Sequence, residues 1–92
     1  MNIAEQVAFS WNGCIIIIQR DDKELWDRVI LYEEDTGRYI CVDADGNIQH
    51  NSLNDLEKID VAMRLATMLA YQDKEAINKI VQEVTGDSIW ML

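Results

Sequence analysis

The segment from Ser10 to Ile18, SWNGCIIII, most constrains the fold because a tight-turn signal is followed by an uninterrupted apolar run. Asn12 and Gly13 both tolerate the positive φ that a two-residue type I′ turn requires, and apolar segments flank them on both sides. The pattern therefore predicts a β-hairpin whose two strands cover residues 7–11 and 14–19.

A short N-terminal helix is the alternative to the first of these strands. Ile3 and Val7 are four residues apart, which places two side chains on the same face of a helix. Gly13 is also a suitable residue to end a helix. Residues 2–10 are compatible with either structure, and the turn signal favours the strand.

Both faces of the second strand are apolar. A two-residue turn fixes the register, so that one face of the hairpin carries Val7, Phe9, Trp11, Cys14, Ile16 and Ile18. The other face carries Ala8, Ser10, Ile15 and Ile17. An apolar strand bounded by turns is typical of a sheet interior that is covered on both sides. Cover by the protein's own helices and tails is the simpler interpretation, and cover of one face by a partner is the alternative.

The rest of the chain predicts further strands and two helices. Strands are expected over 25–33, 38–42 and 48–50, separated by polar or Gly-containing turns. Helices are expected from a cap at Ser52 or Asn54 to about Tyr71, and from Asp73 to Gly86. We predict one α+β domain over residues 1–92, β-rich over 4–50 and helical over 52–86, with an apolar tail at 87–92. Its architecture is an antiparallel meander sheet of three to five strands packed against two C-terminal helices.

The first predicted helix is apolar on two nearly opposite sides. One stripe consists of Leu56, Ile59, Met63, Ala66 and Ala70, and the other of Val61, Leu65 and Met68. We expect this helix to lie between two layers, with the second helix covering its outer side through Ile77, Ile80, Val81 and Val84. The final residues, IWML, are expected to dock into the protein's own core or to add an edge strand to the sheet, with contact to a partner as the alternative.

No arrangement of residues specifies a reaction. His50 is the only histidine and is predicted to be a surface turn residue. Cys14 and Cys41 lie in apolar runs and are expected to be buried thiols, with a disulfide between them as an alternative. A structural zinc site typically requires four Cys or His ligands, and the chain has only two cysteines and one histidine. Residues 43–47, DADGN, resemble the start of an EF-hand calcium loop. Such a loop has glycine at its sixth position and a carboxylate at its twelfth, where this chain has Ile48 and Asn54. We therefore predict no enzymatic activity, no cofactor and no metal.

The chain is strongly acidic, with seventeen Asp and Glu residues against eight Lys and Arg and a formal charge of -9. Such a charge repels nucleic acid and anionic lipid and attracts basic protein surfaces. The N-terminus does not have the pattern of a secretory signal, and no apolar run reaches the ~18 residues that a membrane span requires. We expect a cytoplasmic protein that binds a Lys/Arg-rich protein surface and contacts neither nucleic acid nor membrane.

Successive turns of an up-and-down meander alternate between the two ends of the sheet. One end is expected to gather Asp21, Asp22, Glu24, Asp43 and Asp45. The other end is expected to carry Glu33, Glu34 and Asp35. We predict that these acidic residues bind the partner, and ordinary solvated turns are the alternative interpretation.

In its small size, acidic charge and lack of catalytic motifs, with acids clustered as DDKE at 21–24, EED at 33–35 and DAD at 43–45, the chain resembles phage-encoded inhibitors of bacterial defence, notably anti-CRISPR proteins. The resemblance is one of kind across the chain, without a shared motif, so it assigns no site residues. It implies a stoichiometric inhibitor that binds a CRISPR effector complex in the host cytoplasm and blocks its DNA-binding surface. The alternative is an accessory or homo-oligomerising subunit of a cytosolic complex with no inhibitory role.

Overall fold

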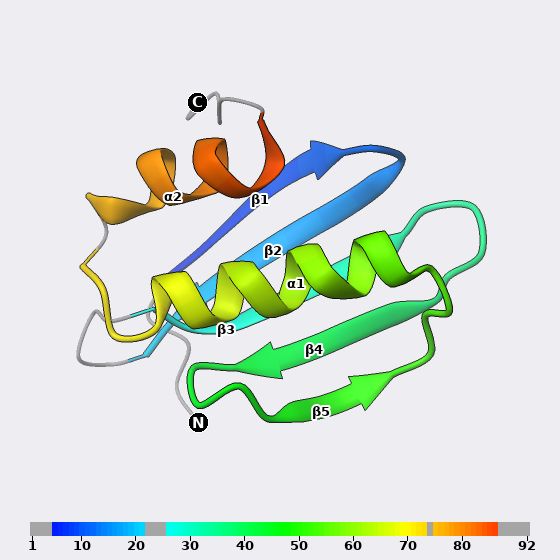
Figure 1. Ribbon diagram of the computed structural model, residues 1–92, viewed down its shortest axis with the longest axis horizontal. Helices are drawn as coiled ribbons and strands as arrows, with labels where there is room; N and C mark the ends of the chain where they lie inside the picture. The colour runs from blue at the N-terminus through cyan, green and yellow to red at the C-terminus, as the bar shows by residue number, and fades with distance from the viewer. Residues whose placement is uncertain (1–4, 22–25, 74, 87–92) are drawn as a thin grey trace.

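A computed structural model describes residues 5–21, 26–73 and 75–86. It contains one antiparallel sheet with strand order β1-β2-β3-β4-β5, followed by two helices (Figure 1). The strands are β1 (Glu5–Trp11), β2 (Cys14–Arg20), β3 (Trp26–Glu33), β4 (Tyr39–Asp43) and β5 (Ile48–Asn51), and the helices are α1 (Leu56–Leu69) and α2 (Ala76–Thr85). The predicted α+β fold, a meander packed against two C-terminal helices, is confirmed.

The hairpin formed by β1 and β2 has the predicted turn and register. Asn12 and Gly13 have φ values of 50° and 74°, as a type I′ turn requires. Trp11 lies opposite Cys14, and the pairing runs without interruption to Glu5 opposite Arg20. The helical alternative is wrong for residues 5–11, which are extended, and residues 2–4 lie outside the described part of the chain.

Both helices lie on the same face of the sheet, side by side (Figure 1). α1 packs over β3 and β4, and α2 lies beside α1 on the side of β1 and β2 (Figure 1). The prediction that α2 covers the outer side of α1 is wrong, because Leu56 is 80% exposed and Met68 is 39% exposed. A five-stranded sheet is roughly 19 Å wide at ~4.8 Å per strand spacing, whereas a helix is only ~10 Å wide. Two helices side by side are therefore needed to cover it.

The isoleucine run of β2 is divided between the two faces of the sheet. Ile16 and Ile18 are fully buried beneath the helices, where the core also contains Val29, Leu31, Ile40, Val42, Leu65, Leu69 and Val81. Ile15 and Ile17 are half-buried on the opposite face, which we call the open face. Within the described residues no helix lies over the open face. The predicted docking of the final IWML segment concerns residues outside the described ranges.

The two cysteines are free and buried. Cys14 faces the helices, whereas Cys41 follows the alternation of β4 to the open face, so the disulfide alternative is wrong. Burial raises the pKa of both thiols, which keeps them protonated and unreactive at neutral pH. His50 is exposed as predicted, but it lies in β5, not in a turn, and stacks on Tyr39 with 4.3 Å between ring centroids.

The helix ends show where local capping signals are ambiguous. α1 is capped by Asp55, whose carboxylate accepts hydrogen bonds from the N–H groups of Glu57 and Lys58, so the predicted caps at Ser52 and Asn54 are wrong. The hydroxyl of Ser52 instead bonds to the backbone of Tyr39, both accepting from its N–H and donating to its carbonyl. Nearby Ser, Asn and Asp residues have similar capping strength, and strand pairing decides between them. α2 ends at Gly86, as predicted.

Candidate functional site

One end of the sheet is tied to the loop between α1 and α2. The N–H of Trp26, the first residue of β3, donates to the carbonyl of Gln72, and its own carbonyl accepts from the N–H of Tyr71. The indole Nε1–H of Trp26 donates to the carbonyl of Asp73 at 2.9 Å. These bonds bring the helical loop alongside the β4–β5 turn, since β3 pairs with β4 there.

Carboxylates gather around the hydroxyl of Tyr71. This hydroxyl donates a 2.9 Å hydrogen bond to Oδ1 of Asp45. That bond, together with the negative charges of Asp45, Asp43 and Asp27, raises the pKa of Tyr71. Asp21 follows β2 at the same end of the sheet. Three separate segments, the start of β3, the β4–β5 turn and the α1–α2 loop, therefore converge here. We call the group formed by Asp21, Asp27, Asp43, Asp45 and Asp73 the acidic end.

Tyr71 has an unusual backbone conformation. Its φ is 58°, in the left-handed region that bulky residues rarely adopt, at a cost of about 1–3 kcal/mol. The hydrogen bonds from its N–H to Trp26 and from its hydroxyl to Asp45 hold it there. The side chain is nevertheless 54% exposed. The strain thus positions an accessible phenol among carboxylates.

Asp43 has an internal role in the β4–β5 turn. Its Oδ1 accepts hydrogen bonds from the N–H groups of Asp45 and Asn47, and its Oδ2 accepts one from Gln49. Burial raises the pKa of Asp43, but these three bonds outweigh that effect and leave its pKa below the ordinary value. Asp43 therefore stabilises the turn, whereas Asp45 is exposed.

Arg20, the neighbour of Asp21 in sequence, is used inside the protein. Arg20 is 5% exposed, forms an ion pair with Glu5 and lies 5.4 Å from the centre of the Trp26 ring. Its charge is therefore directed to Glu5 and to the Trp26 ring. Asp22 and Glu24, the other predicted members of this group, lie outside the described residues.

The opposite end carries Glu34 and Asp35, as the meander predicts. The N–H of Glu34 donates to the carbonyl of Gly13 at 3.2 Å, so the β3–β4 turn lies beside the β1–β2 turn. Both acidic side chains are exposed. Arg38 follows them in the same connection and is also exposed, so a positive charge accompanies the two carboxylates.

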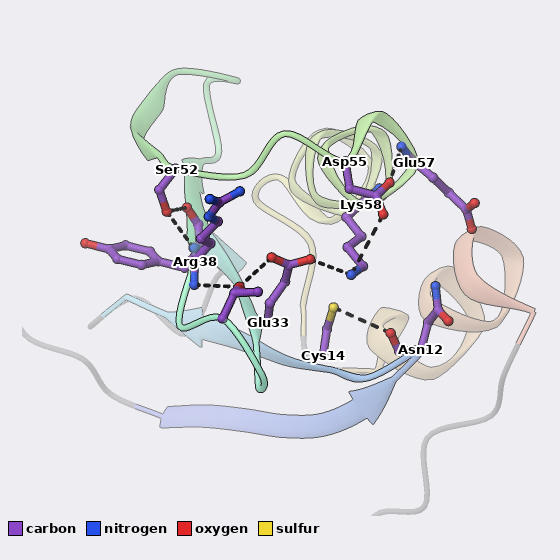
Figure 2. A network of polar contacts seen from close by, with 10 residues as sticks. Asn12, Cys14, Glu33, Arg38, Ser52, Asp55, Glu57 and Lys58 are labelled. Carbon is purple, nitrogen blue, oxygen red and sulfur yellow. Dashed lines mark hydrogen bonds and ion pairs between the residues drawn. The ribbon is translucent and has the colours of Figure 1, made fainter.

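Glu33, by contrast, belongs to an internal polar network between β3 and α1 (Figure 2). It is 9% exposed, and its carboxylate accepts hydrogen bonds from Lys58 Nζ at 2.6 Å and from the Thr36 hydroxyl at 2.7 Å. These two bonds lower the pKa of Glu33, and the bond to Glu33 raises the pKa of Lys58. The Cys14 thiol lies next to this pair and donates to the carbonyl of Asn12 (Figure 2). Because Glu33 is satisfied internally, its charge is not displayed to a partner.

Two members of the acidic end, Asp27 and Asp73, and the tyrosine beside them, Tyr71, were missed by sequence reasoning. Asp27 lies inside a strand, but the meander register that places Arg28 opposite Asp43 would have located it near the turn. Tyr71 and Asp73 carry no such signal, since their position depends on how the α1–α2 loop packs against Trp26.

Other features give no indication of a reaction centre. A surface groove of about 560 Å³ lies between α1, the end of α2 and the β1–β2 turn, and its charged lining residues Glu57, Asp60 and Arg64 are exposed. Across residues 5–21, 26–73 and 75–86, no three His, Cys, Asp or Glu side chains are grouped to hold a metal ion. Neither described helix is long and apolar enough to cross a membrane.

The acidic end is therefore the feature of this chain with the most distinctive chemistry, namely an exposed phenol held among carboxylates that come from separate segments. Comparisons with protein families, with curated proteins and with solved structures find no match to this chain.

Proposed function

We propose that the protein is a stoichiometric inhibitor that applies its acidic end to a Lys/Arg-rich surface of another protein and thereby blocks DNA binding. The observation that carries this proposal is the convergence of carboxylates from β3 and from the β4–β5 turn around the Tyr71 hydroxyl, which the α1–α2 loop supplies. Carboxylates can replace phosphates as partners for Lys and Arg. Opposite fields also accelerate association, by ~10- to 10³-fold at low salt.

The cost of the arrangement supports a role beyond that of a solvated turn. Like charges placed together disfavour the compact state, and the strained backbone of Tyr71 adds a further cost. An exposed tyrosine amid charge is also well suited to anchor an interface, because its ring contributes apolar contact and its hydroxyl a hydrogen bond. Asp45 and Tyr71 would thus act together at the centre of the contact.

The proposed target is the DNA-binding surface of a CRISPR effector complex in the bacterial cytoplasm. This choice rests on the resemblance in kind to anti-CRISPR proteins and on the positively charged channel in which such complexes hold nucleic acid. A protein that fills this channel with carboxylates competes with DNA for the same lysines and arginines.

The test compares charge reversal at the two ends of the sheet. In Asp21→Lys/Asp45→Lys the acidic end is reversed, and in Glu34→Lys/Asp35→Lys the opposite end is changed by the same total charge. Asp43 is left intact because it stabilises the turn. Competition with DNA for purified DNA-targeting CRISPR effector complexes is measured at low and high salt. We expect the first variant to lose affinity by about tenfold or more and the second to lose much less.

Wild-type binding should also weaken steeply as salt increases. Equal losses in the two variants would show that net charge alone matters and that the acidic end is not the contact. An affinity that is flat from low to high ionic strength would contradict the electrostatic mechanism. Thermal melts of both variants provide the control for folding.

A second candidate function is that of an accessory or homo-oligomerising subunit, which the open face favours. Ile15, Ile17 and Ile30 are half-buried there, and Tyr32 and Tyr39 are 39% and 36% exposed beside them. Contiguous apolar surface of this kind often marks an interface. The subunit role predicts that Ile17→Lys abolishes association with the neighbouring subunit, whereas Asp21→Lys/Asp45→Lys leaves that association unchanged. For the inhibitor role we expect the reverse, namely that the aspartate variant loses binding to the target and Ile17→Lys retains it.

A further inference from the structure

The outer edge of β1 is an interaction surface whose geometry is distinct from that of the acidic end. Within the described part of the chain, β1 has a strand partner on one side only. An unpaired edge presents backbone N–H and C=O groups to any extended segment, and proteins usually protect it with a short strand, a bulge, proline or lysine. β5, the other edge, is four residues long and its pairing is irregular at Cys41 and Val42. β1 has seven residues, no proline or lysine, and an uninterrupted register.

The turn determines which backbone groups of β1 face outward. In a hairpin closed by a two-residue turn, the residues flanking the turn form a hydrogen-bonded pair, and bonded and non-bonded pairs then alternate. Trp11, which lies opposite Cys14, therefore directs its backbone groups towards β2. The residues that direct theirs to the outer edge are Gln6, Ala8 and Ser10. All three have exposed side chains.

We infer that β1 pairs with β1 of a second copy of this chain, antiparallel across a two-fold axis at Ala8. In this register Ala8 faces Ala8 of the second copy, and Gln6 faces Ser10, so every outward backbone group finds a partner. Val7 then faces Phe9 on the helix side. Both are only partly buried at the rim of the core, and this contact completes their burial. The two five-stranded sheets become one continuous ten-stranded sheet.

The charge distribution matches the antiparallel arrangement. Glu5, the only charged residue of β1, faces the apolar Trp11 of the second copy, so no like charges oppose each other across the interface. β1 starts at the acidic end, because Glu5 lies opposite Arg20. Antiparallel pairing therefore directs the two acidic ends in opposite directions and keeps them apart. This dimer does not depend on the proposed inhibition.

Cysteine cross-linking tests the register. Residues that exchange hydrogen bonds in an antiparallel pair have Cα atoms about 5.5 Å apart, which suits a disulfide. Ala8→Cys should therefore form a covalent dimer on mild oxidation. Gln6→Cys is a matched control on the same edge, since its counterpart across the axis is Ser10 and not itself. The native thiols are buried. Cross-linking that is equal in the two variants, or absent from both, overturns the proposed register.

Sedimentation tests the dimer without any cross-link. Wild-type protein should shift from monomer to dimer as its concentration rises through the micromolar range. Gln6→Lys/Ser10→Lys places lysines opposite each other only in the dimer and should stay monomeric, whereas Asn54→Lys/Thr67→Lys, with the same charge change at exposed positions of the helical region, should dimerise like the wild type. A wild-type monomer at all these concentrations, or dimerisation of Gln6→Lys/Ser10→Lys, overturns the inference.

Discussion

Replacement of Ile16 by alanine should lower the free energy of unfolding by about 2–5 kcal/mol, whereas the same replacement at Ile17 should cost less than half as much. The two residues are neighbours in one strand and lose the same atoms. Ile16 is fully buried between the sheet and the helices, so alanine leaves a cavity in packed core. Ile17 lies half-buried on the open face, where its removal exposes little that was not already near water.

Urea unfolding measures both costs, with the slope of free energy against urea concentration showing whether each variant unfolds in the same cooperative step. Ile18→Ala and Ile15→Ala repeat the comparison one residue to either side, with Ile18 buried and Ile15 half-buried. Equal costs at all four positions would mean that the open face is covered as thoroughly as the helix face. The division of the isoleucine run between a core and a free surface would then be wrong.

Lys58→Met should produce a large loss of stability of a different kind. It leaves the Glu33 carboxylate between β3 and α1 without the ammonium group that now lies 2.6 Å away. Loss of one member of a shielded ion pair is more damaging than replacement of both, because an uncompensated charge remains. The double variant Glu33→Gln/Lys58→Met should therefore be more stable than Lys58→Met alone. Thermal melts of the wild type, Glu33→Gln, Lys58→Met and the double variant measure this, and strictly additive losses would contradict the coupling.

The same pair should contribute to the pH dependence of stability. The pKa of Glu33 is lowered from 4.5, so its contribution is complete above pH 4.5 and is lost as pH falls through the folded-state pKa. The pKa of Lys58 is raised from 10.5, so its contribution is complete below pH 10.5 and is lost as pH rises through the folded-state pKa. The difference in unfolding free energy between wild type and Glu33→Gln should thus be constant near neutrality and shrink in acid. A difference that grows below pH 4.5 would contradict this assignment.

Local signals were sufficient to predict the sheet. The Asn12-Gly13 turn sets both the hairpin and its register, and alternation along β2 shows which isoleucines share a face. Periodicity along α1 predicted two nearly opposite apolar stripes, which is wrong. The buried residues Val61, Ala62, Leu65, Ala66 and Leu69 form one face, and Leu56 and Met68 are exposed because α2 lies in the same layer as α1. That outcome depends on the width of the sheet, which no single element encodes.

The roles of the acidic residues were harder to predict, because they depend on partners that are distant in sequence. Glu33 and Glu34 are adjacent in the chain, yet only Glu33 faces α1 and finds Lys58 there. Asp43 and Asp45 are two residues apart, yet the first closes the turn and the second holds Tyr71. The order of strands and turns in the sequence was sufficient to predict that Asp43 and Asp45 lie at the same end of the sheet as Asp21. Which of these carboxylates stabilises a turn and which is exposed depends on tertiary contacts.

The meander has a consequence for the way the chain is made. Each strand pairs only with the strand before or after it in the sequence, so each new strand can pair with one that has already been synthesised. The helices that cover Ile16 and Ile18 are synthesised last. The nascent sheet therefore exposes its apolar helix-facing side, which carries Ile16 and Ile18, until α2 has been synthesised. During that interval the carboxylates in the loops repel other acidic nascent chains.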